Sequence, residues 1–343
     1  MGEPRSRKLW LLVLVLARWY YVSMAVTFTI SNYCTHTIWP GTLAGTGTSQ
    51  LSTTGFKLDP GQTVQLAAPA GWSGRIWART GCVFDADGAG VCQTGDCGGR
   101  MECRGAGATP PATLFEVTLD GSGGQDFYDV SLVDGYNLPV VAIPRSRQGG
   151  ACNATGCMAD LNRCKCHRPA PAKACPKELQ VACGGGAIAC RSACEAFGQD
   201  RYCCIGAYGT PDACHPTVYS SIFKSACPRA YSYAYDDSTS TFTCKASDYT
   251  IAFCLPTSGI KKSDAVFLGA QMDGQSTDGG NAPPVYNGGN TPPVYNDGGF
   301  GFQPPIYNYG GGGTRQPAMT ASSGSIVYFR PWLLLLLVPV FFS

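Results

Sequence analysis

The sequence contains few charged residues and very few histidines. Only 14% of its 343 residues are Asp, Glu, Lys or Arg, and only three are His. Coiled coils and helical bundles are rich in charged residues, so this composition excludes both classes. The formal net charge of +2 also lacks the basic excess of a nucleic-acid-binding protein, and we expect no nucleic-acid partner.

Long hydrophobic runs are missing as well. The apolar run from Leu9 to Ala17 covers about nine residues, too few to cross a bilayer core of ~30 Å as a helix. Basic residues precede this run, and Ser23 and Ala25 follow it at the spacing of a cleavage site. The pattern predicts a secretory signal peptide at residues 1–25. The alternative, an uncleaved signal anchor, fits neither the length nor the flanking residues.

A second short apolar run occupies residues 332–342. Small residues and a short spacer precede it, which is the pattern of a signal for attachment of a glycosylphosphatidylinositol (GPI) lipid anchor. We therefore expect a GPI-attachment propeptide at residues 322–343, with the lipid attached at Ser322 or Ser323, and a membrane contact through that lipid. A retained tail or a vacuolar-sorting extension is the alternative interpretation.

Glycine, proline and cysteine are abundant, with 44, 24 and 19 residues. So many cysteines indicate an oxidising compartment and disulfide bonds. The motif Pro-Pro-x-Tyr-Asn recurs at 283–287, 292–296 and 304–308 between glycine-rich spacers. This segment has too little apolar material to form a core, so residues 257–321 are predicted to be a disordered stalk. The stalk either lifts a domain off a surface or serves as an inert spacer.

The remaining part, residues 26–256, has the pattern of a mainly β domain. Short segments of alternating polar and apolar residues, separated by Gly- and Pro-containing turns, predict a β-sandwich. The expected strands cover residues 26–30, 64–66, 75–79, 113–119 and 127–133. Two helices are expected, near 189–197 and from Pro216 to Cys227, since proline is favourable at the first helical position.

The cysteine-rich motifs are specific. They are the run from Gly88 to Cys103, the pair Cys203 and Cys204, the run from Cys227 to Tyr233, and the run from Phe253 to Pro256. Together they resemble the thaumatin-like family of pathogenesis-related plant defence proteins, which includes osmotin and zeamatin. The resemblance implies a flattened β-sandwich with a small disulfide loop region at 80–111 and an inserted disulfide-rich helical region at 159–227.

The resemblance also implies how sixteen of the cysteines pair. The implied bridges are Cys34–Cys254, Cys82–Cys92, Cys97–Cys103, Cys152–Cys244, Cys157–Cys227, Cys175–Cys190, Cys194–Cys203 and Cys204–Cys214. Cys164, Cys166 and Cys183 remain, in or near an insertion that departs from the family pattern. We expect a ninth bridge from Cys164 or Cys166 to Cys183, with one thiol left over. A metal site at Cys-x-Cys-His is disfavoured in an oxidising compartment, so no metal and no cofactor is expected.

Charged residues lie opposite the apolar face on three expected strands. Alternation places Arg75, Glu116 and Asp129 on such faces, while Asp134 follows a strand and Asp236 follows a tyrosine-rich segment. The resemblance implies that these five residues line an acidic cleft that binds β-1,3-glucan or another cell-wall polysaccharide. The implied protein is an antifungal defence protein at the outer plasma membrane or in the apoplast.

Two alternative functions remain open. The cleft can instead be that of a weak endo-β-1,3-glucanase, with Glu116 as the acid, Asp134 or Asp129 as the base, and Trp77 or nearby tyrosines under a sugar ring. The other alternative is a cell-surface structural or receptor-associated protein without glycan activity. Asn153 begins the sequon Asn-Ala-Thr and is the predicted glycosylation site. We expect a monomer.

Overall fold

The computed structural model describes residues 26–147, 152–162, 174–183, 186–260 and 268–269. The predicted signal peptide, stalk repeats, lipid-attachment serines and Cys164 and Cys166 lie outside these described residues. Within the described ranges, no helix is long and apolar enough to cross a membrane.

The first of two five-stranded sheets joins the two ends of the domain. Its strand order is β10-β9-β14-β1-β3, and β1 and β14 pair in parallel while the other neighbours are antiparallel. The strands are β1 (Val26–Asn32), β3 (Thr63–Ala68), β9 (Val140–Ser146), β10 (Thr155–Cys157) and β14 (Ala246–Phe253). Cys34 and Cys254 follow β1 and β14 and are joined by a disulfide, which fixes the carboxyl ends of these two strands together.

The second sheet is antiparallel throughout and carries the candidate site. Its strand order is β13-β8-β7-β4-β2. The strands are β2 (Trp39–Ala44), β4 (Ser73–Arg79), β7 (Leu114–Thr118), β8 (Asp126–Ser131) and β13 (Phe242–Cys244). Ile76, Phe115 and Val130 lie opposite one another on β4, β7 and β8 and are fully buried. Their neighbours in each strand therefore point to the other face of the sheet.

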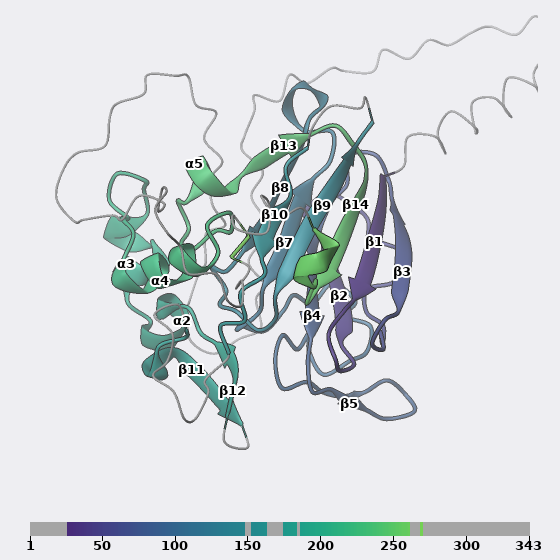
Figure 1. The fold of residues 1–343 in the computed structure, drawn as a ribbon, viewed down its shortest axis with the longest axis horizontal. Helices are drawn as coiled ribbons and strands as arrows, with labels where there is room; N and C mark the ends of the chain where they lie inside the picture. The colour runs from purple at the N-terminus through teal and green to yellow at the C-terminus, as the bar shows by residue number, and fades with distance from the viewer. Residues whose placement is uncertain (1–25, 148–151, 163–173, 184–185, 261–267, 270–343) are drawn as a thin grey trace, which may run out of the picture.

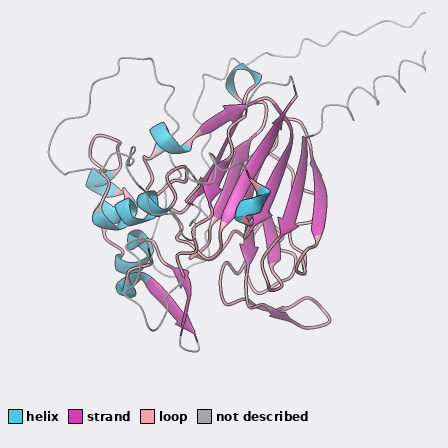
Figure 2. Ribbon diagram, viewed as in Figure 1, coloured by secondary structure: helices cyan, strands magenta, loops and turns pink. Residues whose placement is uncertain are grey.

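The two sheets pack face to face (Figures 1 and 2). The buried core between them includes a cluster of aromatic side chains. Phe28 of β1 packs edge-on against Trp72 and Phe115, with ring centroids 5.3 and 6.2 Å away. Tyr249 of β14 packs against Tyr128 of β8 at 5.2 Å. Side chains from both sheets thus interdigitate, and the predicted sandwich is confirmed.

The helical region lies to one side of the sandwich (Figure 1). It contains the hairpin β11 (Gln180–Cys183) and β12 (Gly186–Cys190), then α2 (Ala193–Phe197), α3 (Asp200–Cys203) and α4 (Val218–Ala226); α5 (Asp237–Ser240) precedes β13. The short strands β5 (Val83–Phe84) and β6 (Gly90–Val91) and the 3-10 turns Ser122–Gly124, Lys177–Leu179, Gly206–Tyr208 and Thr257–Gly259 complete the described elements.

The helix predictions were partly wrong at their boundaries. Ala189 and Cys190 belong to β12, and α2 starts only after Ser192, whose hydroxyl caps it by accepting a hydrogen bond from the Glu195 amide. The helix expected from Pro216 is α4, and its cap is Thr217. The four-residue helices α3 and α5 were not predicted from the sequence, because so short a segment shows no helical periodicity.

Arg79 and Trp77 hold the disulfide loop region against the second sheet. Arg79 is fully buried and donates to the carbonyls of Trp39, Arg100 and Met101. Burial lowers the pKa of Arg79 to about 10. Trp77 is also fully buried and donates to the Gly95 carbonyl at 2.8 Å. The expectation that Trp77 supports a sugar ring was therefore wrong, since loops cover this part of the outer face.

Eight disulfides join sixteen of the described cysteines, in the eight pairs that the family resemblance implies. Cys157–Cys227 connects β10 of the sandwich to the end of α4 in the helical region, and Cys152–Cys244 connects the segment before β10 to β13 of the second sheet. Cys183 is an exposed free thiol. The ninth bridge expected from Cys164 or Cys166 to Cys183 involves residues outside the described part of the chain.

Candidate functional site

A row of three charged side chains crosses the outer face of the second sheet. Arg75 on β4 lies opposite Glu116 on β7, and Glu116 lies opposite Asp129 on β8. Directly opposed residues on antiparallel strands have Cβ atoms about 4.5–5.5 Å apart. The strand register therefore brings together three of the five predicted cleft residues, and we call them the charged row.

The charged row is only partly accessible to solvent. Arg75 Nη2 lies 3.3 Å from Glu116 Oε1, and the two side chains are 8% and 20% exposed. Asp129 is half-buried, and its Oδ1 has no hydrogen-bond partner in the described part of the chain. Burial raises the pKa of Asp129 well above its usual value, and the Glu116 carboxylate raises it further, whereas Arg75 opposes the shift. Asp129 therefore keeps its proton to a higher pH than an ordinary aspartate does.

Tyr231 and Asp237 extend the charged row beyond Asp129. The Tyr231 amide donates to the Val130 carbonyl of β8, and its own carbonyl accepts from the Leu132 amide, both at 2.9 Å. The Tyr231 hydroxyl donates to Asp237 Oδ1 at 2.9 Å. Burial is the largest cause of the raised pKa of Asp129 and of Tyr231. The charge of Asp237 also raises the pKa of Asp129, and the charge of Asp129 also raises the pKa of Tyr231. Sequence reasoning missed both residues, because no periodic pattern runs through this loop.

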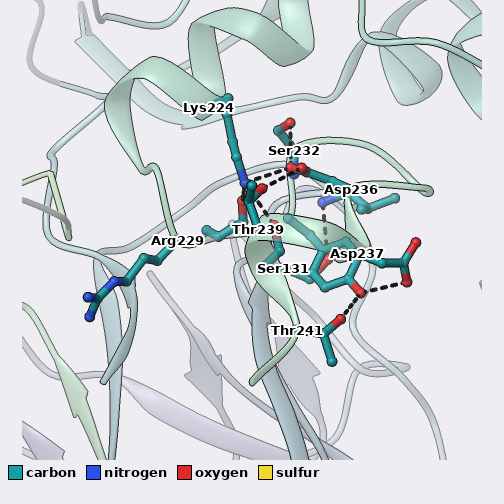
Figure 3. A network of polar contacts seen from close by, with 12 residues as sticks. Ser131, Lys224, Arg229, Ser232, Asp236, Asp237, Thr239 and Thr241 are labelled. Atoms are coloured by element: carbon teal, nitrogen blue, oxygen red, sulfur yellow. Dashed lines mark hydrogen bonds and ion pairs between the residues drawn. The ribbon is translucent and has the colours of Figure 1, made fainter. Parts of the chain in front are cut away.

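Asp236 stabilises its own loop through contacts with Lys224 and Ser232 (Figure 3). Its Oδ2 accepts from the amide and hydroxyl of Ser232 at 3.0 and 2.9 Å, and it pairs with Lys224 Nζ at 2.9 Å. Its Oδ1 accepts from the Thr239 hydroxyl at 3.0 Å. Asp236 is buried, and the carboxylate of this predicted cleft residue binds groups of the protein itself.

Asp134 lies in the turn after β8 and faces a separate pocket. The pocket lies between the sandwich and the helical region, and its lining includes Pro110, Asp134, Glu195, Tyr202 and Ala234. Burial raises the pKa of Glu195 to about 7, Asp134 raises it further, and Arg191 opposes the shift. Glu195 is a third residue that the sequence did not single out, because a glutamate at the start of a helix is common.

The charged row has the chemistry of a polyol-binding site. Carboxylates accept hydrogen bonds, a protonated carboxyl also donates one, and a guanidinium donates several in a fixed plane. Sugar hydroxyls both donate and accept, so the row complements them. Among the residues that the structure describes, no group of His, Cys, Asp and Glu could hold a metal ion.

The chain belongs to the thaumatin family. The model of the Thaumatin family matches residues 32–255, which span both sheets and the helical region. The family resemblance inferred from the cysteine motifs is thereby confirmed.

Relatives in plants match the same part of the chain. Thaumatin-like protein 1 of Arabidopsis thaliana is 55% identical over 240 residues, which cover 68% of this chain and 87% of that protein. Pathogenesis-related protein 5 of the same species is 56% identical over 231 residues, covering 67% and 91%. Among solved structures, the thaumatin-like xylanase inhibitor TLXI is 24% identical and covers 66% of this chain and 99% of that chain, with a TM-score of 0.35.

Proposed function

We propose that this protein is an extracellular plant defence protein that binds β-1,3-glucan or a related cell-wall polysaccharide at the charged row. Membership of the thaumatin family and the name of the pathogenesis-related relative support the defence role. The observation that carries the binding proposal is the contiguous row of Arg75, Glu116 and Asp129 on three neighbouring strands. Such a row offers acceptors and donors to successive hydroxyls of a sugar chain.

The immediate surroundings of the row suit a saccharide. Burial and the neighbouring Glu116 carboxylate raise the pKa of Asp129, and a protonated Asp129 can donate a hydrogen bond to a sugar hydroxyl. Tyr235 is partly exposed and lies near Asp237. Burial raises the pKa of the Tyr235 hydroxyl, and the charge of Asp237 raises it further. Its ring replaces Trp77 as the aromatic surface on which a sugar can lie.

A weak endo-β-1,3-glucanase is the second candidate, favoured by the raised pKa of Asp129 beside Glu116. Glycoside hydrolysis needs one protonated and one ionised carboxyl. The raised pKa of Asp129 suits it to the role of the acid, with Glu116 as the second carboxyl, the reverse of the assignment expected from the sequence.

The location proposed for the protein rests on the sequence patterns at both ends. A signal peptide at 1–25 would direct the chain into the secretory pathway, where the eight disulfides can form. A GPI anchor at Ser322 or Ser323 would hold it at the outer plasma membrane. Release by a phosphatidylinositol-specific phospholipase would test the anchor. Asn153 is exposed, as a glycosylated residue must be.

Binding and hydrolysis can be separated in one experiment on the full chain made in a plant secretory system. The wild type, Glu116→Gln and Asp129→Asn are incubated with insoluble β-1,3-glucan, and bound protein and new reducing ends are measured. Loss of a charged hydrogen bond should weaken binding about tenfold or more. Asp248→Asn is the matched control, because it removes a carboxylate that pairs with Arg145 on the other sheet.

The outcomes distinguish the candidates. Binding by the wild type and the control, weakened in both row variants, supports the lectin-like role. New reducing ends that disappear in both row variants would instead establish a glucanase. A wild type that neither binds nor cleaves glucan would contradict the proposal and favour a surface protein with another partner.

A further inference from the structure

Three aromatic side chains from three different helices meet on the surface of the helical region. Phe197 is the last residue of α2, Tyr202 belongs to α3, and Tyr219 belongs to α4. Their ring centroids lie 5.3, 5.6 and 5.8 Å apart in the three pairs. Phe197 is 37% exposed, and both tyrosines are partly exposed. We call these three residues the aromatic cluster, which lies where the helices gather beside the sandwich (Figure 1).

The aromatic cluster is preformed and has polar groups at its edges. A disulfide joins α2 to α3, so two of the three rings are held by a covalent link. The Arg201 guanidinium lies 4.6 Å from the centroid of the Tyr202 ring, and the Tyr219 hydroxyl donates to Glu178 at 3.1 Å. Proline-rich segments bind such surfaces, because proline rings pack on aromatic faces and the carbonyls of an extended chain need external donors.

The last described residues of the chain lie next to α4. The Met158 amide donates to the Leu268 carbonyl at 2.6 Å, and Leu268 is fully buried. Gly269 packs so closely against the end of α4 that a Cβ at this position would collide with the Ala226 carbonyl. Tyr219 is seven residues earlier in the same helix, or about 10 Å along its axis. The chain therefore leaves the described domain close to the aromatic cluster.

The sequence beyond this point carries the proline repeats. Residues 270–282 separate Gly269 from the first Pro-Pro-Val-Tyr-Asn motif, and a chain of that length can reach about 40 Å when extended. The first motif is therefore long within reach of the aromatic cluster, and two further motifs follow it. Asp297 is the only charged residue between positions 281 and 309, so the repeats bring almost no charge toward Arg201 and Glu178.

We propose that the Pro-Pro-x-Tyr-Asn motifs of this chain bind its own aromatic cluster, one motif at a time, and hold the stalk against the helical region. This contact is independent of the proposed glucan binding. Tethering gives each motif an effective concentration of about 1 mM at the cluster. A motif with a Kd of about 0.5 mM would then be bound about two thirds of the time, so weak contacts suffice.

Nitration of tyrosines by tetranitromethane tests the contact in the full chain. Mass spectrometry follows each site separately, with Tyr202 and Tyr219 reporting on the aromatic cluster. Tyr208 is an internal control, because it is 39% exposed and lies in the 3-10 turn Gly206–Tyr208 outside the cluster. The wild type is compared with a variant that carries Pro284→Ala, Pro293→Ala and Pro305→Ala, one change in each motif.

The triple proline variant should nitrate Tyr202 and Tyr219 about threefold faster than the wild type, with no change at Tyr208. The matched control carries Phe300→Ala and Phe302→Ala, which remove rings from the same segment but outside the motifs, and it should behave as the wild type. A synthetic peptide of residues 281–289, added at millimolar concentration, should slow nitration of the cluster again in the triple variant. All these changes lie outside the described domain, so the midpoint of thermal unfolding should stay nearly constant.

Three results would overturn the proposal. Equal nitration of the cluster in the wild type and the triple proline variant would show that the motifs do not cover it. Protection that increases with protein concentration would assign the cluster to the repeats of a second copy instead. Faster nitration only in the variant of Phe300 and Phe302 would assign the contact to those rings and not to the motifs.

Discussion

At the scale of single residues, the protein places carboxyl groups where their ionisation is unfavourable. Asp129 lies beside Glu116 and Asp237, and Glu195 lies beside Asp134. Burial is the largest cause of the raised pKa of Asp129 and of Glu195. Perturbed carboxyls of this kind gather at functional sites more often than elsewhere, which directs attention to these two positions.

Glu195 should make the stability of the protein depend on pH between about 4 and 7. Its folded pKa of about 7 lies above the ordinary value of ~4.3 for an unfolded chain. Glu195 therefore does not lower the free energy of unfolding below pH ~4. The destabilisation that it causes grows as the pH rises through this window and is constant above it. Because the side chain is partly exposed, we expect Glu195→Gln to stabilise by on the order of 1–2 kcal/mol at pH 8.

Unfolding in urea at pH 4 and pH 8 measures this effect. The gain from Glu195→Gln should be absent at pH 4 and present at pH 8. Glu178→Gln is the control, since Glu178 is exposed and accepts from the Tyr219 hydroxyl. An equal effect of Glu195→Gln at both pH values would argue against a raised pKa.

At the scale of secondary-structure elements, α4 holds the 231–241 loop through one side chain. Lys224 Nζ contacts the Ala230 carbonyl at 3.1 Å, the Ser240 hydroxyl at 2.8 Å and Asp236 at 2.9 Å. Burial lowers the pKa of Lys224, and Asp236 opposes the shift. The loop that carries Tyr231 and Asp237 thus depends on α4 for its position.

Lys224→Met should destabilise the protein by about 1–3 kcal/mol. The change leaves the buried Asp236 carboxylate without its cation, which costs more than loss of an exposed ion pair. Chemical denaturation measures the difference, and Lys57→Met is the control because Lys57 and Asp59 form an exposed pair. Equal, small effects of both changes would mean that Lys224 is not needed to hold the loop.

At the scale of the whole molecule, the Cys34–Cys254 disulfide closes the described domain. The two cysteines are 220 residues apart in sequence, whereas Cys97 and Cys103 are separated by only six. In the chain-entropy model, the stabilisation grows with the logarithm of the loop length. The long-range bridge should therefore contribute more than the local one.

Replacing both cysteines of Cys34–Cys254 by serine should cost about 5 kcal/mol, against about 2 kcal/mol for the same change at Cys97–Cys103. The difference is expected because the longer loop restricts the unfolded chain more. Calorimetric unfolding of the two double variants at one pH measures both values. A larger loss at Cys97–Cys103 would show that local packing of the loop region dominates over chain entropy.

Regular strands made much of the fold and part of the site predictable. Side chains alternate with a period of two, so the polar face of β4, β7 and β8 was evident before the register was known. Cysteine motifs then supplied the family, and with it the sandwich and the helical insertion. The pairing of Arg75 with Glu116 and of Glu116 with Asp129 follows from a register that only the assembled sheet defines.

The sequence by itself determined the class of fold, the presence of disulfide bonds and the faces of the strands, because these depend on composition and on local period. Only the tertiary structure decided that loops cover Trp77, that Lys224 and Ser232 saturate Asp236, and that Tyr231 holds Asp237 beside Asp129. The physical reason is that exposure and hydrogen-bond partners in irregular loops come from residues distant in the chain, which no local pattern records.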